Sequence, residues 1–213
     1  WPRVVYIHAH AAFGWILAQV VGRGDARFRR AVFLSAIAPD FDAMAYLLGL
    51  SISLDQHHVW THNLLFSWAL SLAAMLYCPN MKMRILLLTQ LAFYAHYFGD
   101  YFFTTWPLCF LYPFSPRPFL SAHAFHLWHP VNQWLGAVLA AVALMLCFVC
   151  RRTPLELVSP ALDRAVVRGL GARLASLRSF MNRGRRRPDP PPQPGSGERT
   201  NRRRSIERKE SKG

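Results

Sequence analysis

The chain has 213 residues, of which 53% are hydrophobic, 14% aromatic and only 17% charged. This composition is too apolar and too aromatic for an ordinary soluble domain of the same size. Its net charge of +14 is typical of a nucleic-acid-binding protein, but this charge is concentrated in the part of the chain that begins at Arg151. Residues 1–150 hold eight Lys or Arg, five Asp, no Glu and all nine His, whereas residues 151–213 hold seventeen Lys or Arg against six acids.

Five apolar stretches follow one another in the first part, at residues 4–21, 31–50, 63–77, 84–103 and 131–150. Several of them approach the roughly 20 residues that a helix needs to cross a hydrocarbon core. The sequence therefore predicts an all-α, helical membrane protein in which four to five apolar helices form a bundle. A buried all-α bundle seated on the membrane surface is the alternative.

Basic residues predict how these helices are oriented. They lie between the first two stretches, at Lys82 and Arg84, and after the fifth stretch. Five spans would place all of them on one side, which the positive-inside rule assigns to the cytoplasm. The connections 51–62 and 104–130 contain only Arg117 as a basic residue and would face outward. We therefore expect an integral membrane protein with its basic C-terminal tail in the cytoplasm.

The C-terminal part divides into two segments. Residues 151–182 keep a helical spacing of apolar side chains with arginines between them, which predicts a basic amphipathic helix. Such a helix suits an anionic phospholipid surface, although packing against the protein's own loops is an equal alternative. Residues 183–213 are rich in Arg and Pro and predict a disordered tail. The tail has no aromatic platform, so no specific nucleic acid is expected, and the oligomeric state is left open.

Metal-ligand side chains interrupt the apolar stretches of the 1–150 domain. His96 and Asp100 are four residues apart, so both lie on one helix face. Asp40 and Asp42 follow Pro39, and His57 and His62 precede the third stretch. Imidazole and carboxylate together form the ligand set of zinc or a similar divalent metal.

The free-energy cost of burying charged side chains favours a shared metal ion over aspartates and histidines that are each hydrogen-bonded separately in the core. An unpaired charge at membrane depth costs several kcal/mol, and a shared cation removes that cost. We therefore predict that one or two divalent ions are held by side chains from separate segments. The candidates are His8, His10, Asp40, Asp42, His57, His58, His62, His96 and Asp100. In the opposing interpretation no metal is bound: Asp42 is the N-cap of a helix that begins after the break at Pro39, and the histidines are core residues of a helix bundle.

The order of these motifs resembles the membrane-bound metal-dependent hydrolase family, YdjM/YbcI-like. The resemblance covers about residues 6–119 and rests on an early His, Pro-Asp-x-Asp, His-x4-His, His-x3-Asp and later Trp-Pro and Tyr-Pro-Phe. His58 and Val59 stand where the family has Arg-Gly, Asn63 replaces Ser, and His8 competes with His10. The chain is more distantly similar to zinc-dependent phospholipase C, for which His123, His126 and His129 are only spare candidates.

The resemblance implies a zinc-dependent hydrolase in a bacterial inner membrane. Matched to its motifs, one or two metal ions are expected to be held by His10, Asp40, His57, His62, His96 and Asp100. We expect it to act on an ester or phosphoester through a metal-activated water, with Asp42 as general base and His58 and Thr61 completing the catalytic set. A site at lipid depth favours a membrane lipid or a lipid-linked substrate. The alternatives are a metal-ion or proton transporter, a haem protein, and a non-catalytic membrane protein with a structural metal.

Overall fold

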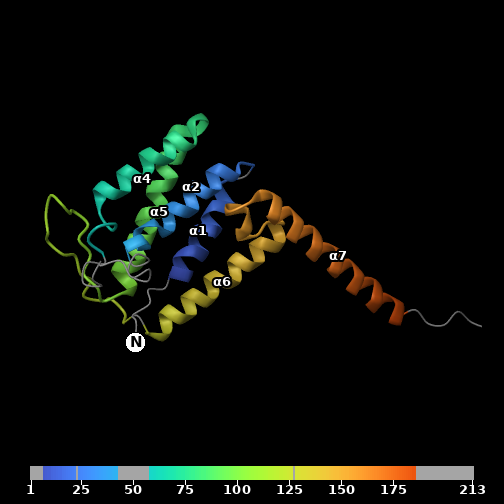
Figure 1. Cartoon of the computed structure of the whole chain (residues 1–213). Helices are drawn as coiled ribbons and strands as arrows, with labels where there is room; N and C mark the ends of the chain where they lie inside the picture. The colour runs from blue at the N-terminus through green and yellow to red at the C-terminus, as the bar shows by residue number, and fades with distance from the viewer. Residues whose placement is uncertain (1–6, 23, 43–57, 127, 186–213) are drawn as a thin grey trace, which may run out of the picture. The chain divides into compact units, whose positions relative to one another are not determined.

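The computed structural model describes residues 7–22, 24–42, 58–126 and 128–185 (Figure 1). These residues form helices and loops without a named strand, with one isolated bridge between Leu108 and Phe119. The helices are α1 (Ile7–Val21), α2 (Ala26–Ile37), η1 (Ala38–Asp40), α4 (Leu64–Tyr77), η3 (Pro79–Met81), α5 (Lys82–Phe103), α6 (Pro130–Cys150), η4 (Pro154–Leu157) and α7 (Pro160–Arg185). The predicted all-α class is confirmed.

Local signals explain where these helices begin. The side chain of Asp25 accepts a hydrogen bond from the Arg27 amide at 2.8 Å and caps α2. Asn63 caps α4 by accepting from the Phe66 amide at 2.8 Å. Pro130 occupies the first turn of α6, where its missing N–H costs no hydrogen bond. The starts of α4 and α6 therefore lie within one residue of the predicted apolar stretches, whereas α2 begins five residues before its stretch because Asp25 caps it.

The helices pack in the order α6, α1, α2, α5, α4, so that helices distant in sequence become neighbours (Figure 1). Small residues allow the central contact: a Cβ atom added at Gly14 of α1 would lie 2.6 Å from the Cβ of Ala36 on α2. The buried apolar core between α1, α2, α4 and α5 includes Phe28, Val32 and Ile85. These five helices, α1, α2, α4, α5 and α6, are called the helix set below.

Membrane-span candidates are fewer than the apolar stretches suggest. Helix α6 is long and apolar enough to cross a bilayer, and α4 with residues 79–103 would count as a second span only if the pair, bent by 111°, is one span. Helices α1, α2 and α4 have 15, 12 and 14 residues, hence lengths of about 22, 18 and 21 Å at 1.5 Å per residue, short of a core of about 30 Å. The number of four to five membrane helices is therefore not confirmed.

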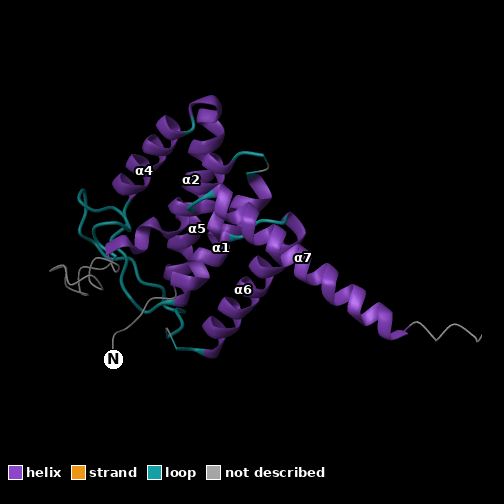
Figure 2. Ribbon diagram, turned by 45° about the vertical axis from the view of Figure 1, so that its right-hand side comes forward, coloured by secondary structure: helices purple, strands orange, loops and turns teal. Residues whose placement is uncertain are grey.

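The two ends of the helix set differ in chemistry. At one end, the Arg29 guanidinium forms an ion pair with Glu156, with Nε 2.9 Å from Oε2, and also donates to the Gly22 carbonyl at 2.6 Å. Arg84 at the start of α5 donates to the Val21 carbonyl. The loops between α5 and α6 gather at the opposite end (Figure 2). Each end of the helix set is thus tied together by contacts between distant segments.

Two compact units divide the chain, residues 1–168 and 169–213. The predicted amphipathic segment is helical in α7, whose first turn is held by Asp163 accepting from the Thr153 amide at 2.7 Å. The predicted disordered tail lies outside the described residues from residue 186 onward. The division into domains at residues 150 and 182 stays a prediction.

Candidate metal centre

Three segments bring ligand-type side chains to the loop end of the helix set. Asp40 lies in η1 directly after α2, and His96 and Asp100 lie on one face of α5. His62 comes from the loop before α4, which Asn63 holds by donating to the carbonyls of Val59 and Trp60 at 2.9 and 2.8 Å. The loop and the two helix ends therefore converge through backbone contacts as well as side-chain contacts.

Asp40, His62, His96 and Asp100 form the metal-ligand cluster, in which one ligand atom of each residue lies within 4.8 Å of the others. The His96 Nε2 atom lies 3.0 Å from Asp100 Oδ2, 3.3 Å from His62 Nε2 and 3.7 Å from Asp40 Oδ1. The His62 Nε2 atom is 3.2 Å from Asp100 Oδ2. All four side chains are buried, so the cluster is shielded from bulk water.

The orientation of His96 suits metal binding. Its Nδ1 atom lies 2.6 Å from the carbonyl oxygen of Ala36, which can only accept a hydrogen bond. The Nδ1 atom therefore carries a proton, and the Nε2 atom faces the cluster. Metal-binding histidines are usually held in this way, by a hydrogen bond from the second ring nitrogen to a backbone or carboxylate oxygen.

The spacing of the ligand atoms also fits a small divalent ion. Zinc ligands at 2.0–2.2 Å in tetrahedral geometry are separated from one another by about 3.3 Å. The separations around His96 Nε2, from 3.0 to 3.7 Å, bracket this value. The two carboxylates, Asp40 and Asp100, would balance the charge of a divalent cation in this buried site. The cluster can therefore bind a metal ion.

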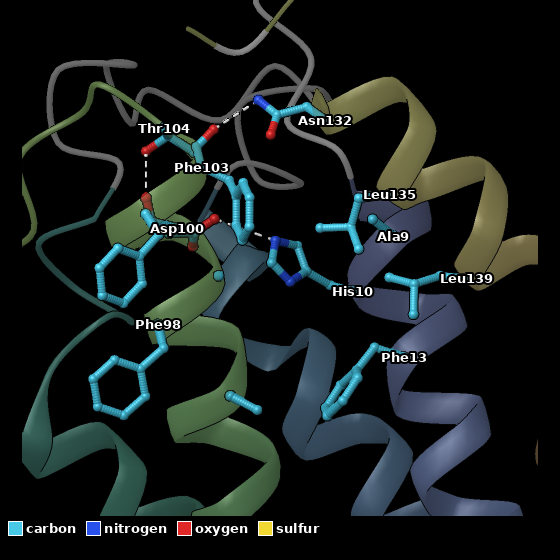
Figure 3. A pocket seen from close by; sticks show the side chains of 13 residues that line it. Ala9, His10, Phe13, Phe98, Asp100, Phe103, Thr104, Asn132, Leu135 and Leu139 are labelled. Atoms are coloured by element: carbon cyan, nitrogen blue, oxygen red, sulfur yellow. Dashed lines mark hydrogen bonds and ion pairs between the residues drawn. The ribbon is translucent and has the colours of Figure 1, made fainter. Parts of the chain in front are cut away.

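His10 extends the cluster from α1. Its Nε2 atom lies 3.2 Å from Asp100 Oδ1 (Figure 3). His62 and His96 contact the other carboxylate oxygen, Oδ2. Its ring stacks on the His96 ring with centroids 3.7 Å apart. His10 therefore positions both Asp100 and His96, whereas His8 is exposed and lies beside Gly136 of α6.

The three predicted catalytic residues lie around His62. Asp42 Oδ2 is 4.0 Å from His62 Nδ1, too far for a hydrogen bond. His58 Nε2 is 3.8 Å from Asp100 Oδ2, and the backbone of this buried histidine has a positive φ of 75°. Thr61 Oγ1 donates to the Pro39 carbonyl, which ties the His62 loop to η1. All three border the cluster without belonging to its four-residue core.

The remaining histidines that the structure describes lie outside the metal-ligand cluster. His57 falls outside the described residues, so its predicted ligand role stays a prediction. His123 and His126 are exposed, and His129 accepts a hydrogen bond from the Val131 amide at the start of α6. Burial raises the pKa of the Cys109 thiol, whose amide donates to the His58 carbonyl. This sulfur is therefore protonated at neutral pH and is not a thiolate ligand.

Sequence reasoning missed the groups that orient the ligands. The carbonyls of Ala36 and Pro39 position His96 and the His62 loop, and a backbone oxygen has no sequence signature. Asn63 could have been recognised, because Asn directly before an apolar helical run is a common N-cap. The Asn63 side chain has the further task of fixing the loop that carries His58 and His62.

Comparison with known proteins agrees with the membrane character of the chain. The profile of the YdjM inner membrane protein family matches residues 6–156. This range contains every member of the metal-ligand cluster and both ends of the helix set. No curated protein and no solved structure matches the chain.

Proposed function

The chain belongs to the YdjM inner membrane protein family, and from this premise we propose that it is a membrane-bound, zinc-dependent hydrolase of esters or phosphoesters. The observation that supports the proposal most directly is the set of 3.0–3.7 Å separations around His96 Nε2, in a site that also contains buried carboxylates. A site that served only to pack helices would not need two buried aspartates at this spacing.

Each residue of the cluster has a role in this proposal. Asp40, His62, His96 and Asp100 hold the ion, and His10 orients Asp100. A bound zinc ion acidifies water and polarises the oxygen of an ester or phosphoryl group. Two carboxylates among the ligands balance the charge of a divalent cation. His57 is a further candidate ligand for a second ion.

The chain's own residues would then manage the proton. Asp42, outside the ligand set but within 4.0 Å of His62, takes a proton from the attacking water, whose oxygen forms a bond to the carbonyl carbon or phosphorus. The bond to the leaving oxygen breaks, and that oxygen receives a proton. His58, close to Asp100, is placed to deliver it. General acid–base assistance of this kind contributes about 10²–10⁴-fold to a rate.

A metal-ion transporter is the second candidate function. A transporter needs a polar path on both sides of its ion site. Among the described residues, apolar side chains such as Val32 and Ala36 pack beneath the cluster, but Ser71, Thr89 and Gln90 are also buried there. These three side chains are hydrogen-bonded between α4 and α5, with Thr89 Oγ1 2.8 Å and Gln90 Nε2 3.0 Å from Ser71 Oγ.

Metal analysis of the full-length protein in detergent tests the assignment. We expect zinc to copurify with the wild type and to be lost from His62→Ala and Asp100→Ala. His126→Ala is the matched control, because this histidine is exposed and lies outside the cluster. The same samples are assayed on phosphomonoester, phosphodiester and carboxylic ester substrates.

The outcomes separate the candidate functions. Hydrolysis by the wild type and the control, with loss in both cluster variants, supports the proposal. Full metal content in both cluster variants contradicts the site. If zinc is lost from His62→Ala and Asp100→Ala but the wild type hydrolyses none of the substrates, the ion is a structural metal in a non-catalytic protein.

A further inference from the structure

An apolar pocket begins at the metal centre and runs along the helices. It has a volume of about 320 Å³, near the lower end of the roughly 300–1,000 Å³ typical of small-molecule sites. Its lining comes from α1, α5, Thr104 and α6 (Figure 3). Because α6 packs on α1 while α5 packs mainly on α2 and α4, the pocket is a groove floored by α1 and walled by α5 and α6. We call it the α5–α6 groove.

The two ends of the groove differ in polarity. The end at the metal centre contains His10, Asp100, Thr104 and Asn132, and these side chains are held by hydrogen bonds. For example, Asn132 donates to the Phe103 carbonyl at 2.9 Å. The rest of the groove is lined by apolar side chains such as those of Phe13, Leu135 and Leu139. The groove therefore fits a molecule with one polar group and one apolar chain.

The groove opens sideways, toward the surface that a membrane would cover. Phe98 and Phe102 on α5 line it and are 57% and 47% exposed, and Leu135 on α6 is 37% exposed. Helix α6 is the candidate membrane span, and only 6% of its apolar window is buried inside the protein. An apolar chain could thus pass between the two helices without leaving the hydrocarbon layer.

We propose that the α5–α6 groove holds the single apolar chain of a lipid substrate while the scissile group lies at the metal centre. This inference rests on the proposed hydrolase function and adds the substrate class. A lipid chain that enters the groove from the bilayer is already out of water. The groove therefore selects by chain shape and places the head group beside His10 and Asp100.

Groove-filling variants test the proposal in the full-length, zinc-loaded protein. Leu139→Trp fills the apolar part of the groove, away from the cluster. Leu144→Trp is the matched control, since the same change on the same helix falls on a residue that is 59% exposed and does not line the groove. The substrates are hexadecyl and butyl phosphate, with the corresponding carboxylic esters if the screen favours them. A hexadecyl phosphate with a diazirine near the middle of its chain serves as a probe that requires no turnover.

We expect Leu139→Trp to lower hexadecyl turnover by about 10–200-fold, the range for misfit in an apolar pocket, and to leave butyl turnover unchanged. The photoprobe should label Phe13, Ala95 or Leu139 in the wild type and in Leu144→Trp, and lose this labelling in Leu139→Trp. Labelling confined to other surfaces, or equal loss of both substrates in Leu139→Trp, overturns the groove assignment.

The same measurements separate the two proposals. Metal-dependent turnover of butyl phosphate without labelling in the groove would uphold the hydrolase and reject the lipid-chain site. Labelling in the groove without turnover of any substrate would reject the hydrolase and, with it, the role of the chain as part of a substrate.

Discussion

Asp100 connects the two halves of the site, because its two carboxylate oxygens have different partners. Oδ2 faces His62 and His96, and Oδ1 faces His10. Its position four residues after His96 was readable from the sequence, since helical periodicity places i and i+4 on one face. Its partners on α1 and in the loop were not readable, because they depend on contacts between residues more than thirty positions apart.

At the residue scale, Asp42→Asn separates metal binding from proton transfer. The amide has the size of the carboxylate but cannot accept a proton from water. We expect zinc content to stay at the wild-type value and turnover to fall by about 10²–10⁴-fold. Asp25→Asn is the control, because Asn caps a helix as well as Asp does and Asp25 lies at the opposite end of α2. Loss of zinc in Asp42→Asn would instead identify Asp42 as a ligand.

His58 combines a buried imidazole with a backbone conformation that favours glycine. Its φ of 75° costs an L-residue about 1–2 kcal/mol. Both His58→Gly and His58→Ala remove the imidazole, but only His58→Ala keeps the backbone strain. His58→Gly should therefore have a higher thermal midpoint in detergent than His58→Ala. If His58 delivers the proton, turnover should fall equally in both variants. If turnover is instead higher in His58→Gly than in His58→Ala, in parallel with the thermal midpoint, then His58 affects turnover through its backbone conformation and not through proton transfer.

At the scale of elements, the α1–α2 contact controls the site from a distance. Gly14 permits the approach of α2, and Ala36 on that face of α2 supplies the carbonyl that holds His96 Nδ1. The sequence predicted both helices from their apolar stretches. It did not predict this contact, because two helices can cross at many points along apolar faces and only side-chain volumes select one of them.

Gly14→Ala is predicted to affect both stability and metal binding. The added Cβ would lie 2.6 Å from the Ala36 Cβ, so the helices must separate. We expect a loss of about 1–3 kcal/mol in unfolding free energy, typical of overpacking. Zinc affinity should fall by about 10–100-fold, as for loss of a group that orients a ligand. Competition with a chelator and denaturant unfolding measure the two effects.

Gly171→Ala is the matched control for this prediction, since an added Cβ there has no neighbouring atom within 4 Å. It should leave zinc affinity unchanged. Equal zinc affinity in Gly14→Ala and the wild type would show that the α1–α2 contact does not determine the position of the Ala36 carbonyl relative to His96.

At the scale of the whole molecule, the basic end and the metal centre lie at opposite ends of the helix set. Arg27, Arg29 and Arg30 begin α2, which ends at the cluster, and Lys82 and Arg84 begin α5, which carries His96 and Asp100. By the positive-inside rule, we expect the basic end in the cytoplasm and the metal centre toward the outer face of the inner membrane.

Cysteine accessibility tests this orientation in intact cells. In a background without the four native cysteines, His123→Cys in the loop after α5 should react with a membrane-impermeant maleimide added outside the inner membrane. Lys82→Cys, exposed at the basic end, should react only after the membrane is permeabilised. The reverse pattern would place the metal centre in the cytoplasm.

The sequence by itself determined the all-helical class, the approximate positions of α1, α4, α5 and α6, and the kinds of side chain available as ligands. These properties depend on local spacing: α4, α5 and α6 follow the predicted stretches closely because apolar periodicity and capping act over a few residues. The tertiary structure alone decided which ligand-type residues converge. It placed His10 rather than His8 beside Asp100, left His123 and His126 on the surface, and opened a groove between α5 and α6. The reason is that separations of about 3 Å between residues distant in the chain arise from how whole helices pack, and helix packing is set by side-chain volume and backbone carbonyls rather than by periodicity.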